Sequence, residues 1–177
     1  ESVEAEQDRY FILDDTTLEK TGFCMEGISR VFDHVAQKSV LGYKLLLLAI
    51  TDKKSTIPVD FSLHAEAGKK KDFGLTRKQR KERFCKKRDS RDCSLKRQKE
   101  LLEEKPKTAI EMLRRALKNG FVAKYLLADK WFFGKDFFHE VRNIRKGKAI
   151  SPHADATRAC MYVSVPNMMA FLCSFSS

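Results

Sequence analysis

The strongest constraint on the fold is the run at residues 43–51, where nearly every side chain is apolar. A short apolar run bounded by turn residues is typical of a β-strand that is covered on both faces. Residues 10–13 predict another buried strand, which ends in a turn at residues 14–17. The alternation of apolar and smaller or polar residues over 56–64 predicts a half-buried strand, and Pro58 places that strand at a sheet edge.

The second half of the chain changes to a helical period. Thr108 and Glu111 form a capping box before apolar residues at helical spacing, and Gly120 ends the predicted helix. Residues 122–128 predict a strand, and residues 131–145 predict an amphipathic helix. The connection at residues 18–41 contains glycines and is expected to be irregular. Since a strand–helix–strand crossover is right-handed, the last strand should run parallel to the first. We therefore predict an α/β fold with a mixed sheet, three antiparallel strands followed by one parallel strand.

Positive charge is concentrated in one stretch. Residues 69–99 contain 15 Lys or Arg and 4 Asp or Glu, so their net charge of +11 equals that of the whole chain. Thr76 and Gln79 form a capping box, which predicts a helix over residues 76–94 that cannot be buried. Such a helix is expected to lie along DNA phosphates; the alternative is a solvated insertion without a fixed partner. An RNA-binding α/β protein is a further alternative.

Other features limit the class of protein. The five cysteines are far apart and form no C-x-x-C pair, which argues against a zinc ribbon and favours reduced thiols. The first residues are acidic and do not match a signal peptide, and no apolar run approaches the length of a membrane span. We expect a soluble intracellular protein with no membrane partner.

Two aspartates follow predicted strands that should be parallel. Asp15 comes after the first strand and Asp129 ends the strand at 122–128. If these strands are neighbours, both carboxylates lie at one carboxyl edge of the sheet, where they suit Mg²⁺ or Mn²⁺. Asp14 is an alternative to Asp15, because successive strand residues point to opposite faces. Asp129 could instead cap the following helix.

Four blocks of the sequence resemble DDE-type transposases, more narrowly the insertion-sequence-four group. They are Leu13-Asp14-Asp15-Thr16-Thr17, Val40-Leu41-Gly42-Tyr43-Lys44, Pro58-Val59-Asp60-Phe61-Ser62 and Leu127-Ala128-Asp129-Lys130-Trp131-Phe132. The resemblance covers about residues 10–146 and implies the ribonuclease-H-like fold of retroviral integrases. It also implies Mg²⁺- or Mn²⁺-dependent cleavage of DNA and joining of transposon ends to target DNA.

The resemblance assigns roles to particular residues. Asp15 matches the first catalytic acid and Asp129 the second, so both are expected to be catalytic metal ligands. The family's third acid, a later Glu, has no match: Glu140 lies too close to Asp129, and only Asp155 is acidic beyond it. The chain alone is therefore expected to be inactive or nearly so. A non-catalytic DNA-binding remnant of a transposase is the alternative function.

The resemblance also sets the expected organisation. Residues 1–148 would form a partial catalytic core with a basic helical insertion at about 69–105. Residues 149–177 would form an atypical tail, premature, frame-shifted or poorly ordered. We expect a homodimer acting on paired transposon ends in a bacterial cytoplasm, associated with the nucleoid when bound to DNA. The basic residues expected to bind DNA are Lys69, Lys70, Lys71, Arg77, Lys78, Arg80, Lys81, Arg83, Lys86, Lys87 and Arg88.

Overall fold

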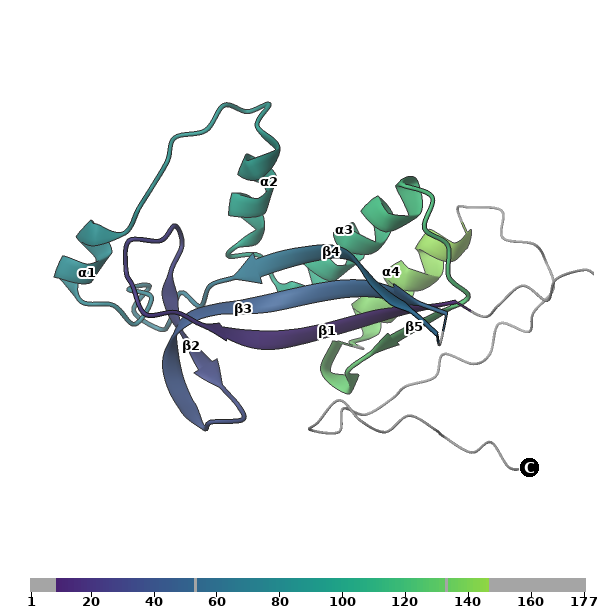
Figure 1. The fold of residues 1–177 in the computed structure, drawn as a ribbon, viewed down its shortest axis with the longest axis horizontal. Helices are drawn as coiled ribbons and strands as arrows, with labels where there is room; N and C mark the ends of the chain where they lie inside the picture. Colours follow the sequence, from purple (N-terminus) through teal and green to yellow (C-terminus); the bar gives the residue numbers. More distant parts are fainter. Residues whose placement is uncertain (1–8, 53, 133, 147–177) are drawn as a thin grey trace, which may run out of the picture.

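The computed structural model describes residues 9–52, 54–132 and 134–146 (Figure 1). Within these ranges a five-stranded sheet carries helices that follow its fourth and fifth strands. None of the described helices is both long enough and apolar enough to cross a bilayer. The elements in chain order are β1 (Tyr10–Glu19), β2 (Ser29–Asp33), β3 (Lys38–Thr51), β4 (Thr56–His64), α1 (Arg77–Glu82), α2 (Cys93–Glu100), α3 (Lys105–Lys118), β5 (Tyr125–Ala128), the 3₁₀ turn η1 (Lys130–Phe132) and α4 (Lys135–Lys146).

The predicted mixed sheet is confirmed, and its topology places β1 between two neighbours. β3 pairs with β1 in antiparallel fashion, and β5 pairs with β1 in parallel, with Leu13 beside Ala128. β2 and β4 both pair with β3 along its other side. Among the described strands β4 pairs only with β3, as Pro58 predicts, and its register shifts next to this proline. The parallel neighbour of β1 arrives through α3, as the predicted crossover requires.

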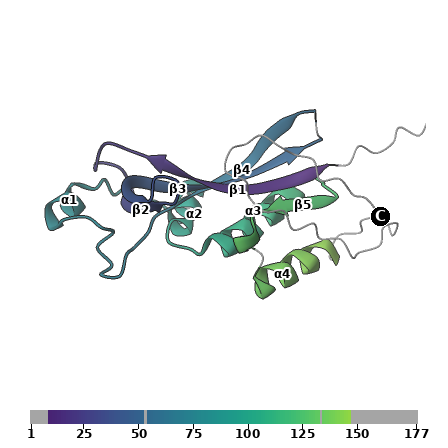
Figure 2. The same cartoon turned by 90° about the horizontal axis from the view of Figure 1, so that it is seen from below.

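Helices α2, α3 and α4 lie on one face of the sheet (Figure 2). The main core forms there from Phe11, Leu46 and Leu48 of the sheet with Met112 of α3 and Phe132 of η1. Burying such side chains contributes about 1.5–3 kcal/mol each. No described helix covers the other face, where the paired residues Leu47 and Phe61 are exposed. The prediction that the strand at 43–51 is covered on both faces holds only in part, because Leu47 is exposed while the other residues of this run are buried or half-buried.

Two expectations for the first half of the chain are wrong. The predicted turn at residues 14–17 is strand, because β1 keeps its register with β3 up to Glu19. The expected irregular connection contains β2, which forms a hairpin with the start of β3. The turn of this hairpin is made locally: Asp33 Oδ1 accepts the N–H groups of Val35 and Ala36, and Gln37 adopts a positive φ of 51°.

The helix predicted from Thr108 begins earlier. α3 starts at Lys105 after the N-cap Glu104, and Thr108 is buried within the helix instead of capping it. Ile110 and Leu113 face the core as predicted. The helix predicted over 131–145 is also shifted, because η1 precedes α4. A capping box read from the sequence indicates a possible start, but α3 extends further towards the N-terminus, where Pro106 is in a position that favours the first turn of a helix.

The basic stretch is not one long helix. The capping box at Thr76 is confirmed, yet α1 ends at Glu82, and α2 begins only at Cys93. A second, smaller core of Ile28, Tyr43 and Leu75 joins this excursion to the sheet. This basic excursion, residues 69–105, is thus packed against the β1–β2 region.

Glu26, in the β1–β2 connection, holds the segment between α1 and α2. Its carboxylate accepts hydrogen bonds from the guanidinium of Arg88, from the side-chain amide of Gln98 at 3.2 Å and from the N–H of Lys86 at 3.4 Å. The hydrogen bonds from Arg88 are the main reason that the pKa of Glu26 is lowered. This one carboxylate therefore connects the segment between α1 and α2, through Lys86 and Arg88, with α2, through Gln98.

Candidate active site

Two carboxylates come together where β1 and β5 run side by side. Because Leu13 pairs with Ala128, the next residues along the two strands are Asp14 and Asp129. Although Asp14 is solvent-exposed, the protein around its carboxyl group removes part of its hydration and raises its pKa. The charges of Asp15 and Asp129 raise this pKa further, while the N–H of Asp15, 2.9 Å from Asp14 Oδ1, opposes the shift. Negative charge is therefore concentrated where β5 ends beside the middle of β1.

Asp15 belongs to the helix-covered side of β1. Its Oδ2 atom lies 2.5 Å from Nζ of Lys105, the first residue of α3. The ammonium group also lies 5.1 Å from the ring centroid of Trp131, which stacks on the buried Phe132. The ammonium group of Lys105 thus connects Asp15 with η1, the turn that directly follows Asp129.

The predicted aspartates are therefore distributed over two local groups. The structure brings Asp129 next to Asp14, whereas Asp15 forms an ion pair with Lys105. Asp129 precedes a 3₁₀ turn, closed by the hydrogen bond from Phe132 N–H to its carbonyl oxygen at 3.0 Å, and α4 begins only at Lys135. An N-cap role of Asp129 for that helix is thus wrong.

The donor atoms fit a hard divalent cation. Asp14, Asp15 and Asp129 offer carboxylate oxygens, the ligands that Mg²⁺ and Mn²⁺ prefer. The mutual repulsion of their charges favours a bound cation, and Lys105 already provides one positive charge. In the part of the chain that the structure describes, no three Asp, Glu, His or Cys side chains are close enough to form a complete metal site. The aspartates could hold an ion only together with other ligands.

His64 and Glu140, the last glutamate of the sequence, both form contacts between elements of the fold. His64 is buried, its Nδ1 lies 3.1 Å from the carbonyl oxygen of Glu103, and burial lowers its pKa. It therefore joins the end of β4 to the segment before α3 as a neutral side chain. Glu140 forms an ion pair with Arg114 at 2.7 Å, connecting α4 to α3.

Sequence reasoning missed Lys105. The helix predicted from Thr108 leaves Lys105 in a connection, so the one signal becomes visible only with the observed start of α3: a lysine in a first helical turn, where the helix dipole disfavours cations and which contains no acidic residue. This signal points to an outside carboxylate as its partner, but the sequence does not identify Asp15.

The basic residues predicted to bind DNA fall into two groups. Arg83 stacks over the ring of Phe73 at 4.3 Å, and Arg88 forms an ion pair with Glu26, so both are engaged in packing the excursion. The others are exposed: Lys69, Lys70, Lys71, Arg77, Lys78, Arg80, Lys81, Lys86 and Lys87.

A mixed sheet with an aspartate directly after one strand and two more within its parallel neighbour is an arrangement that suits metal-dependent nucleases. A family model described as DDE superfamily endonuclease matches residues 2–149, and the chain therefore belongs to this family. Membership implies DNA as the substrate and a general dependence on divalent metal ions. No curated protein and no solved structure matches the chain.

Proposed function

We propose that the chain is the catalytic-core part of a DNA transposase of the insertion-sequence-four-like group. The observation that supports this proposal best is the meeting of carboxylates where β5 ends beside β1: Asp129 directly follows β5, and Asp14 is next to it within β1. Ligands of α/β sheets bind outside the carboxyl ends of strands, so DNA would approach this edge. The reaction would be cleavage of DNA phosphodiester bonds followed by transfer of the freed strand to target DNA.

In this proposal Asp15 and Asp129 hold the divalent ions, Mg²⁺ or Mn²⁺. When bound, the ions would activate a water or a DNA 3′-hydroxyl and stabilise the leaving oxygen. Asp14 is retained as the alternative to Asp15, because it is the aspartate adjacent to Asp129 in the strand register. In this proposal the carboxylates would hold the ions, and the pairing of β1 with β5 positions the backbone that carries them.

A non-catalytic DNA-binding role is the second candidate function. It is favoured by the absence of a third suitably placed acid among the described residues. The last glutamate of the sequence, Glu140, pairs with Arg114 on the helical layer, and only Asp155 is acidic after it. We therefore expect the isolated polypeptide to have weak activity at most. Under the leading proposal, the transposase would act in the cell as a homodimer on paired transposon ends. It would be found in a bacterial cytoplasm and, when bound to DNA, at the nucleoid.

Nicking of supercoiled plasmid in Mn²⁺ separates the two functions. We expect slow, EDTA-sensitive nicking by the wild type that Asp15→Ala and Asp129→Ala both reduce at least tenfold, because each removes an ion ligand. Asp14→Ala should retain nicking if Asp15 is the ligand, and the reverse result would assign the role to Asp14. Salt-sensitive DNA binding without any metal-dependent nicking would support the non-catalytic function instead.

Neutralising charges on α1 is expected to weaken DNA binding and make it less salt-dependent. Removing one Lys or Arg that binds a phosphate should make the slope of log K against log salt shallower by about 0.9. The triple variant Arg77→Gln, Lys78→Gln, Lys81→Gln should therefore reduce the slope by about 2–3, measured by fluorescence anisotropy with a duplex oligonucleotide. The matched control removes three exposed charges from the helical layer, Lys118→Gln, Lys135→Gln and Arg142→Gln. Equal slopes for the two triple variants would argue against a DNA-binding role for α1.

A further inference from the structure

Lys105 is held between two partners at the edge of the candidate site. Its Nζ lies 2.5 Å from Asp15 Oδ2, and the two side chains are only 21% and 17% exposed. On another side the ammonium group faces the ring of Trp131, 5.1 Å away. The charge of Lys105 therefore lies beside the carboxylates of β1.

Helix stability does not explain a lysine at this position. The N-terminus of a helix carries partial positive charge, so a cation in the first turn is unfavourable by about 0.3–1 kcal/mol. Lys105 is the first residue of α3, and the first turn contains no acidic residue. The favourable partner is Asp15, which approaches from the sheet. The ion pair with the Asp15 carboxylate therefore explains why a lysine is favourable at this position.

The carboxylates of the site require a positive charge in the metal-free protein. Asp14 and Asp129 repel each other, and Asp15 adds a third negative charge nearby. Lys105 compensates part of this repulsion through Asp15. A divalent ion on the same oxygen would replace this compensation, and its charge would repel the ammonium group.

We propose that Lys105 is the resident counter-ion of Asp15 and competes with the divalent ion for this carboxylate. The proposal rests on the proposed function, in which Asp15 is a metal ligand. The ion gains Asp15 Oδ2 only when the ammonium group leaves. The ring of Trp131, which the ammonium group already faces at 5.1 Å, would retain the cation after it leaves Asp15, since a cation–π contact contributes about 0.5–1 kcal/mol. Lys105 is thus a positioning residue that sets the threshold for metal binding.

The test is the affinity for Mn²⁺ alone, without DNA, measured by electron paramagnetic resonance of free Mn²⁺ at constant pH and ionic strength. Lys105→Met should bind Mn²⁺ about five- to tenfold more tightly, because a charge-assisted hydrogen bond no longer has to break. Lys105→Arg keeps the cation and should stay near the wild-type affinity. Lys107→Met removes the same charge from the same helical turn, but Lys107 is exposed and pairs with Glu104 at 3.6 Å. It should change the affinity less than twofold.

Two further variants keep the outcomes distinct. Asp15→Asn should weaken Mn²⁺ binding at least tenfold; unchanged binding would overturn the metal role of Asp15 and with it the proposed function. If Asp15→Asn weakens binding while Lys105→Met behaves like Lys107→Met, only the counter-ion proposal is overturned. Circular dichroism checks that each variant is folded. If Lys105→Met does not fold, the comparison of Lys105→Gln with Lys105→Arg decides the question in the same way.

Discussion

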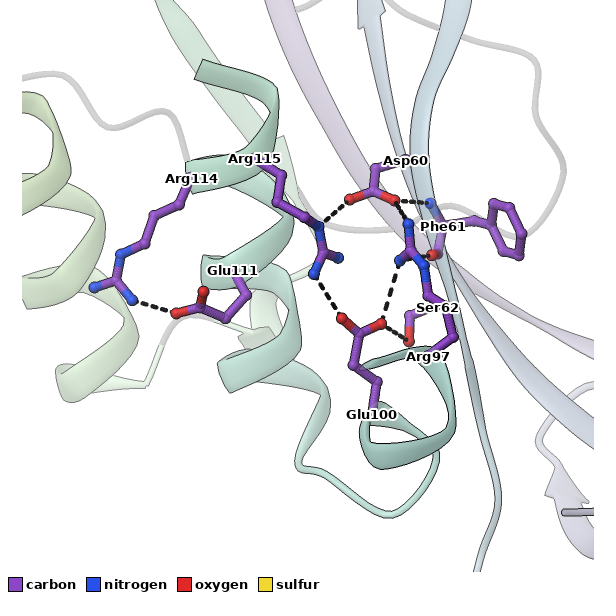
Figure 3. A network of polar contacts seen from close by, with 8 residues as sticks. All are labelled: Asp60, Phe61, Ser62, Arg97, Glu100, Glu111, Arg114 and Arg115. Atoms are coloured by element: carbon purple, nitrogen blue, oxygen red, sulfur yellow. Dashed lines mark hydrogen bonds and ion pairs between the residues drawn. The ribbon is translucent and has the colours of Figure 1, made fainter. Parts of the chain in front are cut away.

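Replacing Arg115 by methionine is expected to lower the free energy of unfolding by about 3 kcal/mol. Arg115, on α3, donates from Nε to Asp60 Oδ2 at 2.8 Å and from Nη1 to Glu100 Oε1 at 2.6 Å (Figure 3). The side chains of Asp60 and Glu100 are only 8% and 12% exposed. Removing the cation leaves two nearly buried carboxylates with less compensation, and the cost of an unpaired buried charge exceeds the gain from forming the pair.

The loss is placed at the lower end of the range for buried ion pairs because a second arginine remains. Arg97 of α2 contacts Asp60 at 2.6 Å and Glu100 at 3.2 Å, and Ser62 Oγ donates to Glu100 at 3.0 Å. These contacts connect β4, α2 and α3 in one network (Figure 3). Arg97 can still neutralise part of the charge, but it cannot satisfy both carboxylates bidentately.

The neighbouring residue provides the matched control. Arg114 is also an arginine of α3, and it pairs with Glu111 and Glu140, but all three side chains are about half exposed. Arg114→Met should cost less than about 1 kcal/mol, since exposed ion pairs contribute little. Urea denaturation followed by circular dichroism measures both variants. Similar losses in the two variants would show that the buried network does not stabilise the fold as argued.

The network also affects the candidate site. α3 begins at Lys105, and Arg115 fixes the same helix to β4 and α2. Because Arg115 anchors the later part of α3, we expect the network to help keep the first residue of the helix, Lys105, beside Asp15. Stability of the polar network and geometry of the site are therefore coupled through one helix.

The elements that the sequence predicts best are those fixed by local pattern. The apolar run at 43–51 and the alternation over 56–64 correspond to β3 and β4, because burial of their side chains is encoded in composition and period. The parallel pairing of β1 and β5 follows from the handedness of crossovers. Element ends are predicted less well. β1 extends through Asp14 and Asp15 because its partner strand continues, and this depends on contacts from a distant part of the chain.

The candidate site shows the same division. The sequence predicts correctly that Asp129 directly follows a strand, whereas Asp15, also expected to follow a strand, lies within β1. That Asp129 lies beside Asp14, and that Asp15 pairs with Lys105, depends on register and on the place where α3 begins. Neither property has a local signal. Likewise the excursion at 69–105 is recognisable as basic, but the withdrawal of Arg88 into a pair with Glu26 joins residues 62 positions apart.

Replacing Gly42 by alanine is expected to destabilise the protein by about 3 kcal/mol, because the methyl group has no space. Gly42 lies where three strands meet, opposite Glu19 of β1 and Ser29 of β2. A Cβ atom built on Gly42 would lie 2.1 Å from the carbonyl oxygen of Leu18, a backbone atom. This oxygen cannot rotate away as a side chain could. The strands would have to separate, which weakens the β1–β3 pairing that also positions Asp14 and Asp15.

Gly22 provides the control, since a Cβ atom there would meet nothing within 4 Å and its φ is not in the left-handed region. Gly22→Ala should therefore change the free energy of unfolding by less than about 0.5 kcal/mol, and the reduced entropy of the unfolded chain favours a small gain. Chemical denaturation of both variants measures the difference. A Gly42→Ala variant as stable as Gly22→Ala would mean that β1 and β3 approach less closely than this register requires. The spacing of the strands that carry the aspartates would then have to be redrawn, since the same hydrogen-bonded register runs from Gly42 to Asp14 and Asp15.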